Sequence, residues 1–203
     1  MLHQSAFFLA VVVGVLLVVY ADGTRETVAA TVFATAVVAM LGASALYHRV
    51  TWSPQVRPWM RRIDHAGIYL LIAGTYTPVG LLVVHGMTRD IVLAIVWSGA
   101  AAAIILKFAW VGAPKWLSAV TGIAVGWAGA AAMPQVVEHA GWAAFALLAA
   151  GGLAYTVGAF VYAFRRPNPV PAVFGYHEVF HALTLVAVAC QYVAIAFFVL
   201  RVG

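Results

Sequence analysis

Long apolar stretches follow one another along almost the whole chain. They fall near residues 5–21, 28–47, 65–84, 91–110, 117–136, 142–164 and 178–200. About 20 predominantly apolar residues are enough for one helix to cross the hydrocarbon core of a bilayer. Because 65% of the 203 residues are hydrophobic and 8% are charged, the stretches leave no room for a separate soluble domain. The sequence therefore predicts a single all-α domain, a polytopic membrane protein with a bundle of seven transmembrane helices.

Basic residues are distributed unevenly over the connecting segments. Those after the second, fourth and sixth stretches, taken together with the last turn of each stretch, contain Arg49, Arg57, Arg61, Arg62, Lys107, Lys115, Arg165 and Arg166. The other side has Arg25, Arg89 and Arg201. Since cytoplasmic loops carry the excess of Lys and Arg, we expect a cytoplasmic N-terminus and a C-terminus outside. The net charge of +5 reflects this asymmetry and does not indicate nucleic-acid binding. No Lys or Arg precedes the first stretch, so we expect a retained helix and not a cleavable signal.

The last apolar stretch begins with the pattern H-E-x-x-H, formed by His177, Glu178, Val179, Phe180 and His181. Residues four apart lie on the same helical face, so the two imidazoles can bind one metal ion. Nitrogen ligands of this kind usually hold Zn²⁺. The alternative is a pair of histidines that face only protein or water.

Glu178 has two alternative roles. In soluble zinc proteases the Glu of this pattern is the general base, which would make the chain an intramembrane metalloprotease. The other interpretation is that Glu178 caps the start of its helix or pairs with Arg61 or Arg62.

The predicted topology brings further polar residues to the same membrane depth. The second stretch ends in the cytoplasm with Ser44 and His48, and the third begins there with Asp64. The seventh begins there with His177 and His181. Three segments that are distant in sequence therefore meet at the cytoplasmic end, which strengthens the prediction of a metal site.

Three blocks of sequence carry a resemblance to a known family. Residues 44–48, 64–78 and 177–181 are similar to the signature blocks of the hemolysin III family, the bacterial branch of the progestin and adiponectin receptor (PAQR) superfamily. The resemblance implies a seven-helix bundle with its N-terminus inside and a zinc ion held by His48, His177 and His181. Asp64 would hold or activate a water molecule there, and Ser44 would support it.

Bacterial members of that family usually open with an acidic, Asn-containing block that ends in Thr-His just before the first helix. In this sequence only His3 is available to correspond to that block. The resemblance therefore leaves the role of the N-terminal segment open.

Three imidazole ligands leave a fourth position open, as in catalytic zinc sites. Zinc activates water and polarises carbonyl groups, so the sequence predicts a hydrolase of a membrane-lipid amide or ester. The family resemblance implies that this hydrolase is similar to a ceramidase and lies in the bacterial plasma membrane. Alternatives remain for two residues: Asp64 can merely orient a ligand, and Ser44 can merely pack between helices. A sensor or regulator of the membrane with structural zinc and a hemolysin-like pore are the alternative functions. The apolar stretches contain few ionisable residues to line a pore.

Five further residues carry structural predictions. Gly122 and Gly126 form a GxxxG pattern, which predicts close packing of helices within the bundle. Pro78 should bend the third helix, and Tyr76 is placed to line a lipid cavity. His65 points about 100° away from Asp64 around the helix, so we expect a packing residue and not a ligand.

Overall fold

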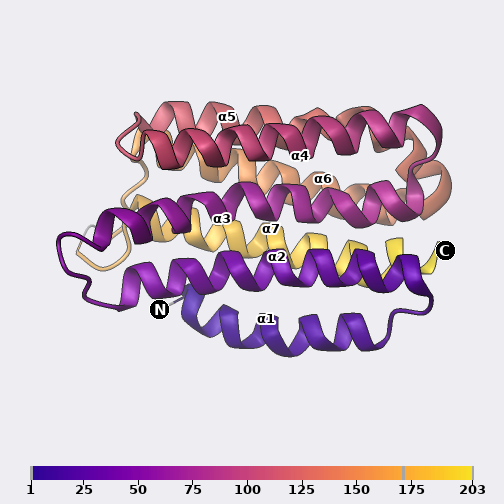
Figure 1. Cartoon of the computed structure of the whole chain (residues 1–203), viewed down its shortest axis with the longest axis horizontal. Helices are drawn as coiled ribbons and strands as arrows, with labels where there is room; N and C mark the ends of the chain where they lie inside the picture. Colours follow the sequence, from indigo (N-terminus) through magenta and orange to yellow (C-terminus); the bar gives the residue numbers. More distant parts are fainter. Residues whose placement is uncertain (1, 171, 203) are drawn as a thin grey trace.

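The computed structural model describes residues 2–170 and 172–202, and this part of the chain is helical with no β-strand. The α-helices are α1 (Leu2–Val19), α2 (Thr24–Arg49), α3 (Arg57–Pro78), α4 (Gly86–Ala109), α5 (Lys115–Trp127), α6 (Met133–Phe164) and α7 (Tyr176–Phe197). Short helical turns of other types are η1 (Val79–Val83), η2 (Ala128–Ala132) and η3 (Val199–Arg201). The helices run side by side along the long axis, and the two termini lie at opposite ends (Figure 1).

Within the described residues, six helical segments are long and apolar enough to cross a membrane. They are Leu2–Val19, Thr24–Arg49, Arg57–Val83, Gly86–Ala109, Lys115–Phe164 and Tyr176–Arg201. The prediction of an all-α protein with several membrane-spanning helices is therefore confirmed. The segment Lys115–Phe164 is 50 residues long and contains two of the predicted stretches. Inside it, Gly141 has φ 85° and ψ 169°, a conformation that interrupts the helix and that glycine adopts without strain.

The helices that carry the predicted site extend beyond the predicted apolar stretches. α3 begins at Arg57, about two turns before the stretch at 65–84, and Pro58 occupies its first turn. Proline is favoured there because its missing N–H is not needed for a helical hydrogen bond. Arg61, Arg62 and Asp64 make these first turns polar, so hydropathy does not detect them.

The helices α2 and α3 pack closely against each other at two glycines. A methyl group added to Gly74 would overlap the Cβ of Ala36, and one added to Gly67 would lie 3.1 Å from the Cα of Met40. Small residues allow helix backbones to approach in this way. The predicted packing role of Gly122 and Gly126 is wrong, because nothing lies within 4 Å of a methyl group added to either.

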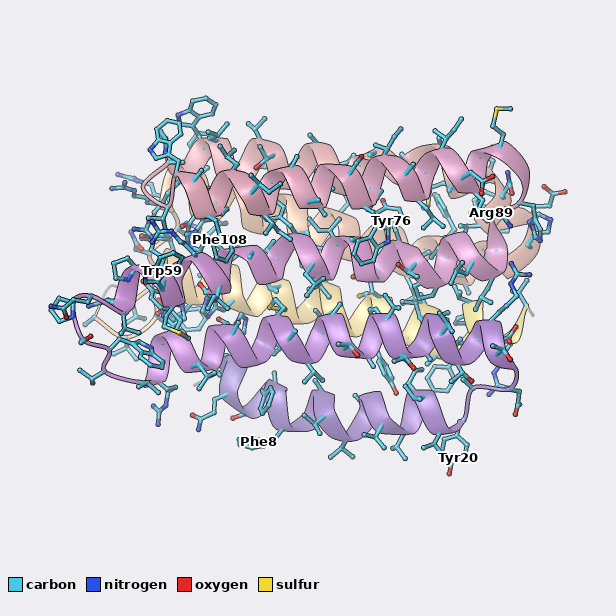
Figure 2. All side chains as sticks on the ribbon, in the orientation of Figure 1. Phe8, Tyr20, Trp59, Tyr76, Arg89 and Phe108 are labelled. Atoms are coloured by element: carbon cyan, nitrogen blue, oxygen red, sulfur yellow. The ribbon has the colours of Figure 1, made fainter. Side chains whose placement is uncertain are left out.

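The α-helical hydrogen bonding of α3 ends at Pro78, and the chain continues as a π-helix over Val79–Val83. The chain thus changes from α-helical to π-helical hydrogen bonding at Pro78, and the bend expected of the third helix stays a prediction. Just before this change, the side chain of Tyr76 points into the bundle (Figure 2). Its hydroxyl donates a hydrogen bond to the carbonyl of Gly126, and its ring lies against Gly129. Tyr76 thereby joins α3 to α5 and to the turn that follows α5.

Candidate metal centre

Three histidines from two helices form a cluster at one end of the bundle. His48 lies in the last turn of α2, and His177 and His181 lie in the first two turns of α7. Each offers a ring nitrogen that is within 4.8 Å of the other two. The Nε2 atoms of His48 and His177 are 3.3 Å apart. The ring centroids of His177 and His181 are 4.4 Å apart, as expected for neighbours on one helical face. The three imidazoles therefore lie close enough to hold one metal ion.

Asp64 lies beside this cluster. Its Oδ2 atom is 3.9 Å from Nε2 of His48, and its side chain is 12% exposed, compared with 33% for His48. Asp64 reaches this position because α3 begins two turns before it and runs antiparallel to α2. The structure therefore brings together the residues on which the sequence analysis converged.

His3 lies against this cluster, and the sequence reasoning did not assign it a role. It is 5% exposed, and its Nδ1 atom lies 2.8 Å from Oγ of Ser44 in a hydrogen bond. Its ring stacks on that of His181, with centroids 3.9 Å apart and planes 14° apart. The available signal was its correspondence to the Thr-His block, but only the packing of α1 shows what it contacts. Ser44 and His181 are thus both held in place by the first helix.

Glu178 caps α7. Its Oε2 atom accepts a hydrogen bond of 2.9 Å from the backbone N–H of Gly175, the residue before the helix. Of its two proposed cation partners, Arg62 instead donates from Nε to the carbonyl of Phe108 at 3.0 Å and stacks over Trp59. Trp59 and Phe108 mark this end of the bundle in Figure 2. Of the roles considered for Glu178, helix capping is the one for which the structure provides a contact.

A cavity of about 320 Å³ extends from the cluster into the bundle. Asp64, His177 and His181 line one end, and Ile72, Tyr76 and Phe145 are among the side chains that line the rest. The prediction that Tyr76 lines a cavity is confirmed.

Small residues of α5 help to form this space. Gly122 and Gly126 line the cavity, which is why a methyl group added to either would meet no neighbouring atom. The cavity has the size and the mostly apolar lining of small-molecule sites in proteins.

The fold and the site define a multi-pass helical membrane protein with a three-histidine cluster that can hold a metal ion. The family model described as Haemolysin-III related matches residues 1–192, and the chain belongs to this family. The chain is 31% identical to Hemolysin-3 of Bacillus cereus over 98% of its own length and 89% of that protein. It is 29% identical to the Hemolysin-3 homolog of Bacillus subtilis (strain 168), over 98% of its length and 92% of the relative. The resemblance seen in the sequence is thereby confirmed.

Proposed function

We propose that this protein is a zinc-dependent hydrolase of a membrane-lipid amide or ester, in the bacterial plasma membrane and related to the PAQR superfamily. The observation that carries the proposal is the continuity of the three-histidine cluster with a largely apolar cavity. A metal centre that opens into such a cavity suits a substrate with a long acyl chain and a polar group at one end.

The proposed topology has seven crossings, with the N-terminus in the cytoplasm and the C-terminus outside. It requires the segment Lys115–Phe164 to cross twice and to turn near Gly141. The positions of the two termini at opposite ends of the bundle support an odd number of crossings (Figure 1). The excess of basic residues near the histidine cluster supports a cytoplasmic location for the site.

The donor set suits zinc. His48, His177 and His181 would hold the ion through ring nitrogens, which Zn²⁺ accepts in a tetrahedral site. When bound by three neutral imidazoles, zinc supplies Lewis acidity that activates water and polarises a carbonyl group.

The protein's own groups provide the remaining functions. Asp64 lines the cavity and lies close to His48, where its carboxylate can accept a proton from an attacking water molecule. Ser44 supports the site through its hydrogen bond to His3, and the ring of His3 in turn orients His181 by stacking. Metal ligands commonly depend on such outer contacts for their orientation. The apolar lining excludes water from the rest of the substrate.

Two alternatives are less well supported by contacts. An intramembrane protease would need Glu178 as a general base, whereas its carboxylate caps α7. The relatives carry the name Hemolysin-3, which keeps pore formation as a candidate. A water-filled pore needs polar or ionisable side chains along the spans, and here the ionisable ones are concentrated at the ends.

Turnover in proteoliposomes tests the proposal. Zinc-loaded wild-type protein should release labelled acyl chains from ceramide or from a phospholipid. Asp64→Asn should lower this rate by about 100-fold or more while it keeps its zinc. Asp90→Asn is the matched control, since Asp90 forms an ion pair with Arg89 at the other end of the bundle. Figure 2 shows Arg89 at that end.

A sensor or regulator with structural zinc predicts a different result. If wild-type protein with bound zinc hydrolyses none of these lipids, and removal of zinc only unfolds the protein, a sensor or regulator with structural zinc replaces the hydrolase.

A further inference from the structure

Lys107 is buried in an unusual position for a lysine. It lies in the last turn of α4 and is 1% exposed. A lysine near the end of a transmembrane helix normally extends its ammonium group to the polar interface. From the sequence, Lys107 was expected to be one of the cytoplasmic basic residues. The structure instead turns the side chain inward, where an unpaired charge is costly.

The protein provides little compensation for this charge. An ammonium group has three N–H donors, and the hydrogen bond that the structure gives Lys107 Nζ is to the Ser118 hydroxyl. Within residues 2–170 and 172–202, the carboxylates that lie within 4.0 Å of a basic nitrogen are Asp64 and Asp90, and neither pairs with Lys107. The nearby Arg61 is also positive and therefore gives no compensation. The ammonium group of Lys107 therefore has N–H donors that are not used within the protein and a positive charge that is not compensated.

Lys107 lies at the wall of the cavity. Lys107 and Ser118 line the same cavity as Asp64 and His181. His65 lines it too, and its buried Nδ1 atom has no hydrogen-bond partner in the described part of the protein. One wall of the cavity thus carries His177 and His181 of the histidine cluster, and the α3–α4–α5 wall carries a cation with a hydroxyl and an imidazole beside it.

Lys115, by contrast, is a lysine whose positive charge is compensated by neighbouring groups. Its Nζ atom donates a hydrogen bond of 2.5 Å to the hydroxyl of Tyr176. It also lies 4.5 Å and 4.4 Å from the ring centroids of Tyr162 and Tyr176, close enough for cation–π attraction. Lys115 is not among the residues that line the cavity. The two lysines have the same charge but different surroundings, so one serves as the control for the other.

We propose that Lys107 binds the acidic group of an acyl lipid in this cavity, and that the ligand of the protein carries a carboxylate or phosphate. Oxygen atoms of either group accept strong hydrogen bonds from an ammonium ion. The acyl chain would occupy the apolar remainder of the cavity. The inference builds on the proposed function, because it assumes that a lipid enters the cavity, but it does not require turnover. It favours an acidic lipid over a neutral ceramide as the substrate.

Equilibrium binding of three lipids with one acyl chain tests this inference. Radiolabelled oleate, oleoyl lysophosphatidate and mono-oleoylglycerol are bound to the full-length protein in a neutral detergent. Wild-type protein should bind at least one acidic lipid about tenfold more tightly than mono-oleoylglycerol, and the tighter acidic lipid distinguishes carboxylate from phosphate. Lys107→Met should remove the preference, whereas Lys107→Arg and the control Lys115→Met should keep it.

Two results would overturn the inference: no preference for acidic lipids in the wild type, or an undiminished preference in Lys107→Met. Lys107→Gln, which keeps a hydrogen-bond donor without the charge, replaces Lys107→Met if that variant does not fold. Because binding is measured without turnover, a protein that binds acidic lipids through Lys107 but hydrolyses none would refute the proposed hydrolase and leave this inference intact.

Discussion

Histidines lie close together at both ends of the bundle, but only one end has the features of a metal site. The near end is the one with the three-histidine cluster, and the far end is the opposite one. At the far end, His85 and His139 have ring centroids 4.9 Å apart, and both side chains are exposed. No third potential ligand joins this pair in the described part of the chain. At the near end, His48, His177 and His181 come together beside a carboxylate and a cavity.

The difference between the two ends of the bundle shows which features a metal centre requires. Proximity of two imidazoles is not sufficient, because zinc requires a third ligand and a shell of contacts that orients the rings. Near the cluster, α1 provides His3, α2 provides Ser44 and α3 provides Asp64. At the far end, the recorded polar contact of His85 is made by its backbone N–H, to Gln135 at 2.7 Å. The histidines of the far end therefore provide matched controls for those of the near end.

The largest expected effect concerns removal of the metal. Chelation should abolish lipid hydrolysis by the wild-type protein, and added zinc should restore it, because the activity depends on the Lewis acid. The double variant His85→Ala/His139→Ala should behave like the wild type in both steps of this turnover assay. Loss of zinc-dependent turnover in the double variant would remove the distinction between the two ends.

Metal binding should also stabilise the fold, with a smaller effect. Zinc at 100 to 1,000 times its dissociation constant adds about 3–4 kcal/mol to the free energy of unfolding. Thermal unfolding with and without zinc should show this gain in wild type and in His85→Ala. His177→Ala should show almost none of it, and an equal gain in that variant would mean that zinc binds elsewhere.

A third prediction concerns the contacts around the cluster. His3→Ala removes the ring that stacks on His181 and the partner of Ser44, so the zinc affinity should fall by about tenfold. Ser44→Ala should weaken binding in the same direction. Competition with a fluorescent zinc chelator measures both affinities, with His139→Ala as the control. An unchanged zinc affinity in both variants would mean that His3 and Ser44 contribute only to packing.

The smallest effect is expected for Glu178. Glu178→Ala removes the cap of α7 and should lower the free energy of unfolding by about 1 kcal/mol. Zinc content and the rate of lipid hydrolysis should change little. A decrease in that rate by a hundredfold or more, with zinc retained, would instead identify Glu178 as a general base.

Much of the fold could be predicted from the sequence, because the bilayer imposes a length and a polarity on each helix. The residues at which the helices begin and end were harder to predict. The first turns of α3 are polar and project beyond the apolar stretch, so hydropathy misses them. The turn at Gly141 depends on one backbone conformation within a continuous apolar segment.

The convergence of His48, His177 and His181 was also predictable, because helical spacing and the alternation of crossings bring them to one depth. Residues whose role depends on side-chain packing were not. His3 contacts Ser44 only because α1 packs against α2. Lys107 is indistinguishable in sequence from a lysine that reaches the interface, and its burial depends on α5 and Ser118. Gly122 and Gly126 match a packing motif but face a cavity.

The central claim is that α2 and α7 share one zinc ion. Elemental mass spectrometry of detergent-purified wild type, His48→Ala, His177→Ala and His85→Ala tests it most directly. The account predicts about one zinc per chain in wild type and in His85→Ala, and almost none in His48→Ala and His177→Ala. Folded wild-type protein that binds no zinc, or His48→Ala that keeps a full equivalent, would contradict it.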